Sequence, residues 1–283
     1  MTKGFVTVDL CPIAPKCENS DLAAPHRSSY PTNEPFPLTT APPMKLPELF
    51  DTATPLPAHE RYGEKPFPGS SHDWAFAALR DLPSIGALLD IGPGSGVIAK
   101  QLATADLPPS AAVEPDRASW EYLKSLYPTL VASLEDLPAE AQFDTILLLD
   151  VLEHVVEPSG FLERAVNALR PGGHLLISVP NVAHIAIRLL LLAGYFPKMS
   201  KGPLDQTHLH FFTGSTMRAF ITAHPSLEII AHRSSIPPLE LLIPPSWHQH
   251  PAWRLLQRWH LALANLLPGL FAYQLLYVVR KKA

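Results

Sequence analysis

The stretch LLDIGPGSG, residues 88–96, places an apolar run directly before three glycines, Gly92, Gly94 and Gly96. The apolar run predicts a buried strand, and the residues from Val97 onward predict a helix. Glycine lets the chain turn sharply and lets a ligand approach main-chain N–H groups. The helix that follows directs its positive end at the same place. The stretch therefore predicts a strand–loop–helix unit that binds a nucleotide.

Two acidic residues indicate which nucleotide this is. Glu114 closes the next predicted strand, 22 residues after Gly92, where a carboxylate accepts hydrogen bonds from ribose hydroxyls. Asp90 lies on the first strand, just before the glycines. A carboxylate there repels the pyrophosphate of a dinucleotide and attracts the ammonium and sulfonium groups of S-adenosylmethionine. We therefore predict S-adenosylmethionine, rather than NAD, as the cofactor.

Apolar runs alternate with helical patterns along the chain from about residue 70. The predicted strands lie within 87–92, 110–116, 129–138, 143–155, 174–181, 227–235 and 271–279. The predicted helices begin at Ser71 and within 95–105, 119–127, 159–173 and 215–225. Runs without alternation are typical of strands buried on both faces. We predict an α/β fold: a doubly wound, Rossmann-like, mostly parallel seven-stranded sheet with an antiparallel edge strand and helices on both faces.

The first 69 residues differ from the rest of the chain in composition. They hold 13 of the 32 prolines and show no sustained period. We expect residues 1–69 to form a Pro-rich, disordered arm and residues 70–283 to form the cofactor-binding domain. The two cysteines, Cys11 and Cys17, both lie in the arm, which excludes a disulfide framework and fits a reducing compartment.

Charge and hydropathy restrict the partners and the location. The net charge of −4 argues against DNA and RNA as partners. No signal peptide is evident, so we expect a cytoplasmic protein. Residues 259–279 lack charged side chains over a length sufficient to span a membrane, but Pro268 and Gly269 interrupt them. We expect a helix followed by a strand there, and peripheral membrane contact and oligomeric state stay open.

These motifs, taken in order, resemble those of the class I S-adenosylmethionine-dependent methyltransferases over roughly residues 70–283. LLDIGPGSG is similar to the family's first motif and AAVEPD to its second, which implies that Asp90, the three glycines and Glu114 hold the cofactor. SLEDLP is similar to the adenine-side segment and implies contacts from Ser133 and Leu134. FDTILLLDVLEHV, LRPGGHLLISVPN and DQTHLHFFT most resemble the subgroup with ubiquinone-pathway O-methyltransferases and small-RNA 2′-O-methyltransferases.

Asp150, Glu153 and His154 follow the fourth predicted strand, at the mouth of the cofactor cleft. One helical turn would place all three on one side, and Asp150 would also border the cofactor. Methyl transfer needs an aligned nucleophile, and a hydroxyl needs a base or a metal that lowers its pKa. His154 is our candidate for the general base.

The resemblance to the small-RNA enzymes implies a sharper alternative, a divalent metal site. Its four positions fall on Asp150, Glu153, His154 and His208, with Asp150 in place of a longer Glu. Two carboxylates and two imidazoles suit Mg²⁺, Mn²⁺ or Zn²⁺. A third interpretation is structural: the two acids orient local backbone while His154 acts alone or only packs.

The remaining candidates concern the acceptor. Asn181, His208 and His210 are predicted to bind substrate. His210, and also His184, which lies shortly after Asn181, would equally fit a core or surface position. We expect residues 182–212 to form a lid over the acceptor and 237–268 to form a helical insertion. The tryptophans of this insertion would line an acceptor pocket, dock on lipid or pack on the sheet, and they are Trp247, Trp253 and Trp259.

The function that we predict is transfer of a methyl group from S-adenosylmethionine to an oxygen of a small hydroxylated or lipid-linked acceptor. Glycan precursors, quinones and natural products belong to this class, and fold alone does not choose among them. The alternatives are metal-assisted 2′-O-methylation of RNA and a non-catalytic, cofactor-binding partner protein. A nicotinamide-dependent oxidoreductase fits less well because the glycine spacing is not G-x-G-x-x-G and because of Asp90.

Overall fold

The computed structural model describes residues 56–61, 69–105, 107, 111–239, 246 and 250–283. The chain divides into two units, 1–47 and 48–283, and every described residue belongs to the second. The disorder predicted for residues 1–69 therefore lies mostly outside the described residues. Residues 56–61 correct that prediction, because they form a helical turn, α1 (Ala58–Arg61), that hydrogen-bonds to the domain.

The described strands form one sheet in the order β3-β2-β1-β4-β5-β7-β6. Their bounds are β1 Leu88–Ile91, β2 Ala111–Val113, β3 Leu130–Val131, β4 Phe143–Leu149, β5 Leu169–Pro180, β6 Leu227–Ser234 and β7 Gln274–Lys281. The first five strands pair in parallel, and β7 pairs antiparallel with both β5 and β6. The predicted fold is confirmed, with the antiparallel pairing at the β7–β6 edge and β6 outermost.

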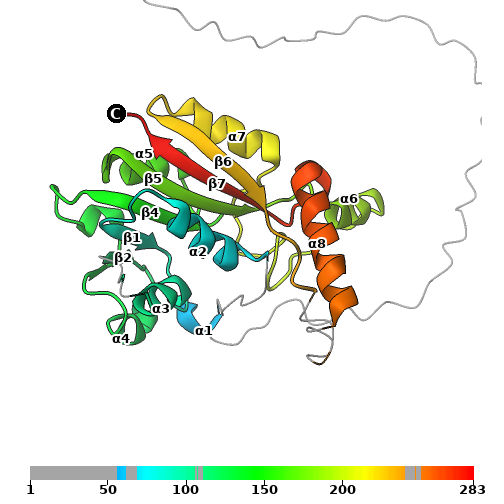
Figure 1. Cartoon of the computed structure of the whole chain (residues 1–283), viewed down its shortest axis with the longest axis horizontal. Helices are drawn as coiled ribbons and strands as arrows, with labels where there is room; N and C mark the ends of the chain where they lie inside the picture. Colours follow the sequence, from blue (N-terminus) through cyan, green and yellow to red (C-terminus); the bar gives the residue numbers. More distant parts are fainter. Residues whose placement is uncertain (1–55, 62–68, 106, 108–110, 240–245, 247–249) are drawn as a thin grey trace, which may run out of the picture. The chain divides into compact units, whose positions relative to one another are not determined.

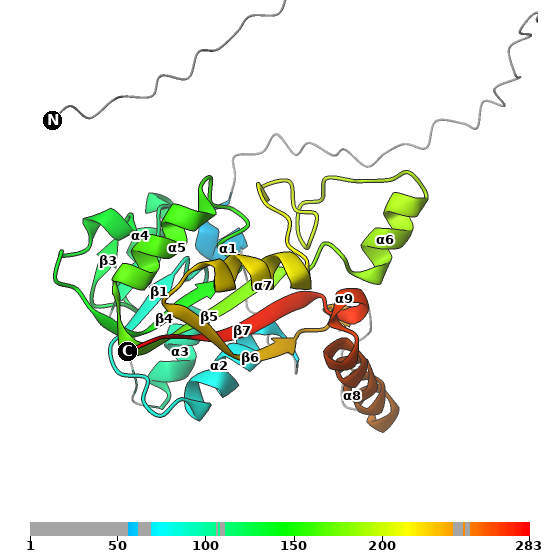
Figure 2. The same ribbon diagram turned by 90° about the horizontal axis from the view of Figure 1, so that it is seen from above.

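Helices cover both faces of this sheet (Figures 1 and 2). Their bounds are α2 Ser71–Asp81, α3 Val97–Ala103, α4 Trp120–Leu123, α5 Pro158–Asn167, α6 Ile185–Leu192, α7 Gly214–Ala223, α8 Pro251–Leu266 and α9 Pro268–Phe271. One buried cluster joins α2 and α3 to the sheet, and another joins α5 and α7 to its opposite face. Short 3₁₀ turns, η1 Arg117–Ser119 and η2 Leu134–Asp136, follow β2 and β3.

The central strand β4 shows why its sequence is an unbroken apolar run. Leu147 packs toward α2 and α3, whereas Ile146 and Leu148 pack toward α5 and α7, and all three are fully buried. Successive side chains of a strand point to opposite faces, so a strand covered on both sides has no polar face. The interpretation of such runs as central parallel strands is therefore confirmed.

Several element boundaries differ from those predicted. The helix expected to end at Gly172 ends at Asn167, because Leu169 already pairs with Phe143 and starts β5. The strand expected over 129–138 keeps only the two residues of β3, and the helix expected over 119–127 is divided between η1 and α4. The cap of α2 is Ser70, whose hydroxyl accepts a hydrogen bond from Asp73 N at 3.1 Å.

The C-terminal residues form α8, α9 and β7, which confirms the expected helix followed by a strand in place of a membrane span. Within the part of the chain that the structure describes, no helix combines the length and hydropathy needed to cross a bilayer. The insertion predicted over 237–268 contains α8, whereas Trp247 lies outside the described residues.

Candidate functional site

The glycine loop between β1 and α3 has a backbone that only glycine accommodates easily. Gly92, Gly94 and Gly96 all have positive φ, at +67°, +54° and +65°. A Cβ on Gly92 would lie 3.0 Å from the Val151 side chain, and one on Gly96 would collide with Leu126. The glycines therefore hold a tight strand-to-helix turn at the carboxyl end of β1, the edge at which open α/β sheets bind ligands.

Asp90 and Glu114 lie on the same face of the sheet beside this loop. Asp90 pairs in register with Ala112, and Glu114 is two residues further along, so their side chains share a face. Both are buried, with exposures of 3% and 4%. Tyr127 donates a hydrogen bond of 2.5 Å to Asp90 Oδ2, and Asp116 N donates one of 2.9 Å to Glu114 Oε1.

Burial raises the pKa of both carboxyls because an ion is poorly solvated there. The pKa of Asp90 is raised to about 6, with the Tyr127 hydrogen bond acting in the opposite direction. The pKa of Glu114 is raised to about 7, chiefly by burial and further by the charges of Asp116 and Asp90. Two buried acids with raised pKa values favour a ligand that brings positive charge and hydrogen-bond donors.

The turn α1 contacts the residues that follow Glu114 and those that border the glycine loop. Ala58 N donates a hydrogen bond of 2.7 Å to Asp116 Oδ2, and this bond is the main cause of a lowered Asp116 pKa. The His59 ring stacks on Tyr122 at 4.7 Å between centroids. Tyr122 in turn donates a 2.8 Å hydrogen bond to Ser95 O in the glycine loop. Residues that composition assigned to the arm are therefore part of the site's wall.

Ser133 and Leu134, expected beside the adenine, begin η2. Leu134 is buried in the core with an exposure of 8%, and Ser133 N donates a 3.1 Å hydrogen bond to Asp136 Oδ2. Their predicted contact with the cofactor stays a prediction.

Asp150 begins the turn after β4 in an unusual backbone conformation. Among the described residues it is the non-glycine residue with positive φ, at +56°, a conformation that costs on the order of 1–3 kcal/mol. Its carboxylate accepts hydrogen bonds from Ser178 Oγ at 2.7 Å and from Gln274 Nε2 at 2.6 Å. These contacts bind the ends of β4, β5 and β7 together.

Glu153, His154 and His208 form a compact group. Each offers a ligand atom within 4.8 Å of the others, and the two imidazole rings meet edge to face at 4.7 Å between centroids. Glu153 is 1% exposed, and burial, then the charge of His154, lowers the pKa of His208. Asp150 is not in this group, and its carboxylate accepts hydrogen bonds from Ser178 and Gln274, so its predicted role as a fourth ligand stays a prediction.

The DQTHLH segment reaches this group through main-chain bonds. Leu209 N and His210 N both donate to Glu153 O, at 2.8 and 3.0 Å. His154 Nδ1 lies 3.2 Å from both Thr207 O and Thr207 Oγ1. Because a carbonyl only accepts, the bond to Thr207 O requires a proton on Nδ1, which leaves the lone pair on Nε2. A base or a metal ligand needs that lone pair.

Thr207 is itself held by a carboxylate. Asp205 Oδ1 accepts hydrogen bonds from Thr207 Oγ1 at 2.7 Å and Thr207 N at 2.8 Å. Arg61 of α1 approaches the same oxygen at 3.4 Å, and Asp205 is 4% exposed. The chain Arg61–Asp205–Thr207–His154 thus links α1 to the imidazole.

Three other predicted residues have local partners. The amide of Asn181 is fully buried and donates to Pro268 O and Ala272 O, while its Oδ1 accepts from Ala183 N. The substrate contact predicted for Asn181 is therefore corrected to an anchor for α9. His184 caps α6 through Ala186 N, so it serves the helix. His210 Nε2 lies 3.3 Å from Val156 O, and its substrate contact stays a prediction.

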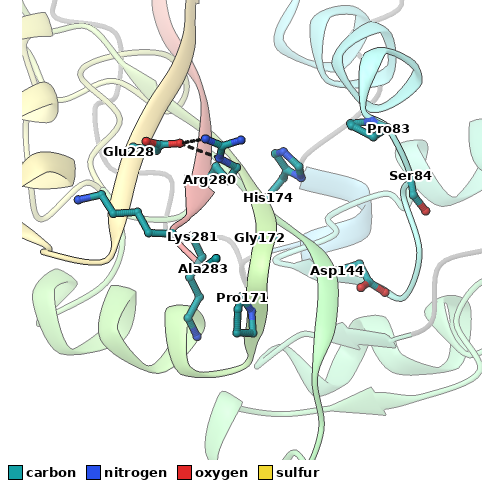
Figure 3. A pocket seen from close by; sticks show the side chains of 12 residues that line it. Pro83, Ser84, Asp144, Pro171, Gly172, His174, Glu228, Arg280, Lys281 and Ala283 are labelled. Atoms are coloured by element: carbon teal, nitrogen blue, oxygen red, sulfur yellow. Dashed lines mark hydrogen bonds and ion pairs between the residues drawn. The ribbon is translucent and has the colours of Figure 1, made fainter.

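A shallow depression of about 590 Å³ lies at the opposite end of the sheet (Figure 3). Its charged groups have partners, because Arg280 pairs with Glu228 and Lys281 Nζ donates to Val166 O and Leu169 O. It borders the starts of β4 and β5 and contains none of the predicted site residues. The chemistry therefore belongs to the glycine-loop end.

Sequence reasoning missed Tyr127, Gln274 and the roles of Asp205 and Thr207. Asp205 and Thr207 lie inside the quoted DQTHLH motif, so a signal existed. Gln274 contacts Asp150 across 124 residues, and no local pattern marks it.

Fold and site together define an α/β domain of the nucleotide-binding type, with two buried acids, Asp90 and Glu114, beside its glycine loop. A family model described as a methyltransferase domain matches residues 66–223, more than half of the chain. The chain therefore belongs to the class I S-adenosylmethionine-dependent methyltransferases.

Relatives of known name are distant. The ubiquinone biosynthesis O-methyltransferase of Xanthomonas euvesicatoria pv. vesicatoria is 30% identical over 117 residues, 38% of this chain and 49% of that protein. That of Caulobacter vibrioides is 27% identical over 150 residues, 49% and 58% of the two chains. The chain spans about half the length of the curated relatives it matches.

A solved S-adenosylmethionine-dependent methyltransferase from Archaeoglobus fulgidus aligns over 75% of this chain and 94% of its own. Its identity to this chain is 17% and its TM-score is 0.48.

Proposed function

We propose that this protein transfers the methyl group of S-adenosylmethionine to an oxygen atom of a small hydroxylated or lipid-linked acceptor. The observation that carries the proposal is the arrangement of two groups at the carboxyl edge of the sheet. Asp90 and Glu114 form an acidic crevice beside the glycine loop, and Glu153, His154 and His208 cluster after β4. The first group suits the cofactor and the second suits an acceptor.

The residues present fit the cofactor. Glu114 would accept hydrogen bonds from the ribose hydroxyls, and Asp90 would favour the positive end of the ligand. The three glycines of the loop have positive φ and no side chains, which would let the cofactor approach main-chain N–H groups. Ser133 and Leu134 belong to the adenine side of this proposal.

His154 is the proposed general base. When bound, the cofactor supplies a methyl group on a positively charged sulfur. His154 Nε2 would accept the proton of the acceptor hydroxyl, so that the hydroxyl oxygen could take the methyl group that the bound cofactor would supply. Thr207 orients the ring for this step by holding the proton on Nδ1.

The choice of oxygen rests on the relatives. Both curated proteins above are named as O-methyltransferases of ubiquinone biosynthesis. For this chain the acceptor class extends to glycan precursors, quinones and natural products, and His208 and His210 are the proposed acceptor-side residues.

Methyl transfer from labelled S-adenosylmethionine to a panel of phenolic, quinol and lipid-linked glycan acceptors tests the proposal. We expect transfer to at least one class, and a loss of about 10²–10⁴-fold in His154→Ala because general-base catalysis contributes that much. The matched control is His224→Ala, a histidine that pairs with Glu163. Equal turnover of His154→Ala and wild type would refute the base role, and no transfer to any acceptor despite cofactor binding would favour a non-catalytic partner protein.

A divalent metal is a second candidate, favoured by the Glu153–His154–His208 group. One carboxylate and two imidazoles suit Mn²⁺ or Zn²⁺, with Mg²⁺ less suited to nitrogen ligands. A metal held there would lower the pKa of an acceptor hydroxyl. RNA as the acceptor in such a reaction is the weaker proposal, because the net charge is −4.

Metal analysis of the purified protein separates these two candidates. We expect stoichiometric metal in wild type, and its loss in Glu153→Gln and in His208→Ala, if the group is a metal site. The control is Glu135→Gln, an exposed acid that pairs with Arg164. The same low metal content in wild type and in all three variants would exclude the metal proposal and leave His154 as the base.

A further inference from the structure

Helix α8 presents a continuous apolar stripe to solvent. Its inner face is anchored to β6, since Ser234 Oγ donates to Ala264 O and Ser234 N donates to Asn265 Oδ1. The outer face repeats at helical spacing and is 37–76% exposed, at Leu255, Leu256, Trp259, Leu263 and Leu266. A stripe of this size is typical of an interaction surface.

A second apolar patch follows β5. Ile187 fixes α6 to the domain with an exposure of 5%, whereas the rest of α6 and the next loop expose large apolar side chains. These are 38–85% exposed, at Leu189, Leu190, Leu191, Leu192, Tyr195, Phe196 and Met199. Among the described residues, therefore, no other element covers this face of α6.

The two patches belong to one end of the domain. Figures 1 and 2 show α6 and α8 together at this end, and Figure 2 shows α9 between them. Arg188 of α6 donates a 3.2 Å hydrogen bond to Gly269 O of α9, and Asn181 at the end of β5 donates to Pro268 O. We call the exposed apolar residues of α6, its following loop and α8 the docking surface.

The two sequence segments that carry the apolar patches lack acidic residues. Residues 182–204 and 246–283 contain no Asp or Glu, although the whole chain carries a net charge of −4. Exposed cations flank both apolar patches, at Lys198, Lys201 and Arg258. Apolar stripes flanked by cations suit the boundary between headgroups and acyl chains of an anionic bilayer.

Two alternatives fit these observations less well. A two-fold dimer through the same surface would bring these cations against their own copies with no acid among them. A spanning role is excluded for α8 by its length, because 16 residues extend about 24 Å, short of the hydrocarbon core. A helix lying in the plane of the membrane avoids the repulsion between like charges and does not need the length of a spanning helix.

We propose that the docking surface binds an anionic lipid membrane, with α6 and α8 lying in the interface. The binding is independent of the proposed reaction. Its consequence, that a lipid-linked acceptor reaches the Glu153–His154–His208 group from the bilayer, rests on the proposed function. The docking surface adjoins the site at Asn181, the residue after β5. Asn181 donates to Pro268 O of α9 on one side and pairs with Phe212, close to the DQTHLH segment, on the other.

Vesicle flotation tests this proposal directly. The probes are vesicles of phosphatidylcholine alone and of equal parts phosphatidylcholine and phosphatidylglycerol. We expect the protein to float with the anionic vesicles and to partition at least tenfold less to the neutral ones. Each Lys or Arg near an anionic surface raises the binding constant about fivefold. High salt screens this attraction and should therefore reduce binding to the anionic vesicles.

Exposed-face variants identify the surface. Leu256→Gln combined with Trp259→Gln should weaken flotation at least tenfold, whereas Leu107→Gln, another exposed leucine, should not. Lys198→Gln combined with Arg258→Gln should remove the preference for anionic vesicles, and Lys124→Gln should keep it. All variants should retain the wild-type affinity for S-adenosylhomocysteine, since none lies in the cofactor crevice.

The outcomes separate the two proposals. Absence of flotation, or flotation unaffected by the α8 variants, would overturn the docking surface while cofactor binding stands. A dimer in solution that Trp259→Gln dissociates would overturn it in favour of a second copy. Flotation as expected, with no methyl transfer to any acceptor, would instead count against the proposed function alone.

Discussion

The buried carboxylate of Asp90 destabilises the empty protein but favours binding of a positively charged cofactor. Its carboxyl is buried and its pKa is raised from 3.8 to about 6, so the ionised form destabilises the empty protein at neutral pH. The difference corresponds to about 3 kcal/mol. Tyr127 contributes a hydrogen bond that an amide oxygen would also accept.

Asp90→Asn should therefore stabilise the empty protein and weaken cofactor binding. We expect the free energy of unfolding to rise by up to about 3 kcal/mol at pH 7, and the affinity for S-adenosylmethionine to fall at least tenfold. Denaturant unfolding and calorimetric titration measure the two effects. Asp81→Asn, an exposed acid at the end of α2, should change stability by less than about 0.5 kcal/mol. A destabilised Asp90→Asn with unchanged affinity would contradict this role.

Cofactor affinity should also depend on pH. Asp90 and Glu114 have pKa values of about 6 and about 7, so both gain protons as the pH falls through these values. Binding that needs both ionised forms is full at high pH, and it should weaken about tenfold per pH unit between about 7 and 6 and about a hundredfold per pH unit below about 6. Titrations of S-adenosylhomocysteine across this range measure the slope. Affinity independent of pH would mean that the carboxylates do not contact the ligand.

Thr207 should act through His154. Thr207→Val removes the hydroxyl that lies 3.2 Å from Nδ1 and that donates to Asp205. We expect methyl transfer to fall at least tenfold and its pH profile to shift, because the ring loses a partner, while cofactor affinity stays constant. Thr222→Val, whose hydroxyl bonds only within α7, is the control. If both variants behave alike, Thr207 is structural only.

At the scale of elements, the glycine loop connects β1 to α3 through a backbone that excludes side chains. Gly96→Ala would introduce a Cβ at positive φ and against Leu126. We expect a loss of more than about 2 kcal/mol from strain and overpacking together. Gly269→Ala in α9 meets no atom within 4 Å and should change stability by less than about 1 kcal/mol in either direction. Thermal unfolding compares the two, and equal melting temperatures would refute the steric argument.

The elements show where sequence patterns are sufficient and where they are not. The runs at β1, β4 and β5 predict their strands because burial on both faces leaves an unbroken apolar signature. The end of α5 was misplaced because pairing of Leu169 with Phe143 is a tertiary contact that overrides helical periodicity. The turn α1 was hidden in a Pro-rich segment, since its helix depends on acceptors supplied by Asp116 and Ser119.

The same limit applies to the site. Glu153 and His154 share a turn, and His208 joins them through main-chain bonds to Glu153, so a motif pattern was enough to predict the group. The position of Asp150 outside this group could not be predicted from local sequence, because its carboxylate is held by Gln274 of β7. Asn181 was misassigned because its position at a strand end does not reveal that α9 covers it.

Three regions occupy different parts of the described domain: the cofactor and acceptor residues, the docking surface, and the depression of Figure 3. The cofactor crevice and the Glu153–His154–His208 group lie at the carboxyl edge of the parallel strands, and the docking surface adjoins this edge. The depression of Figure 3 lies at the other end and has its charges paired. On the proposals above, one end of the domain would bind the cofactor, the acceptor and a membrane, and the other end would only stabilise the sheet.

The central claim is that an acidic crevice beside the glycine loop selects a cationic sulfur donor over a phosphate-bridged one. Calorimetric titration of the protein with S-adenosylmethionine, S-adenosylhomocysteine and NAD⁺ tests it most directly. The account predicts saturable, one-to-one binding of the first two and no binding of NAD⁺. Binding of NAD⁺, or no binding of either sulfur compound, would contradict it.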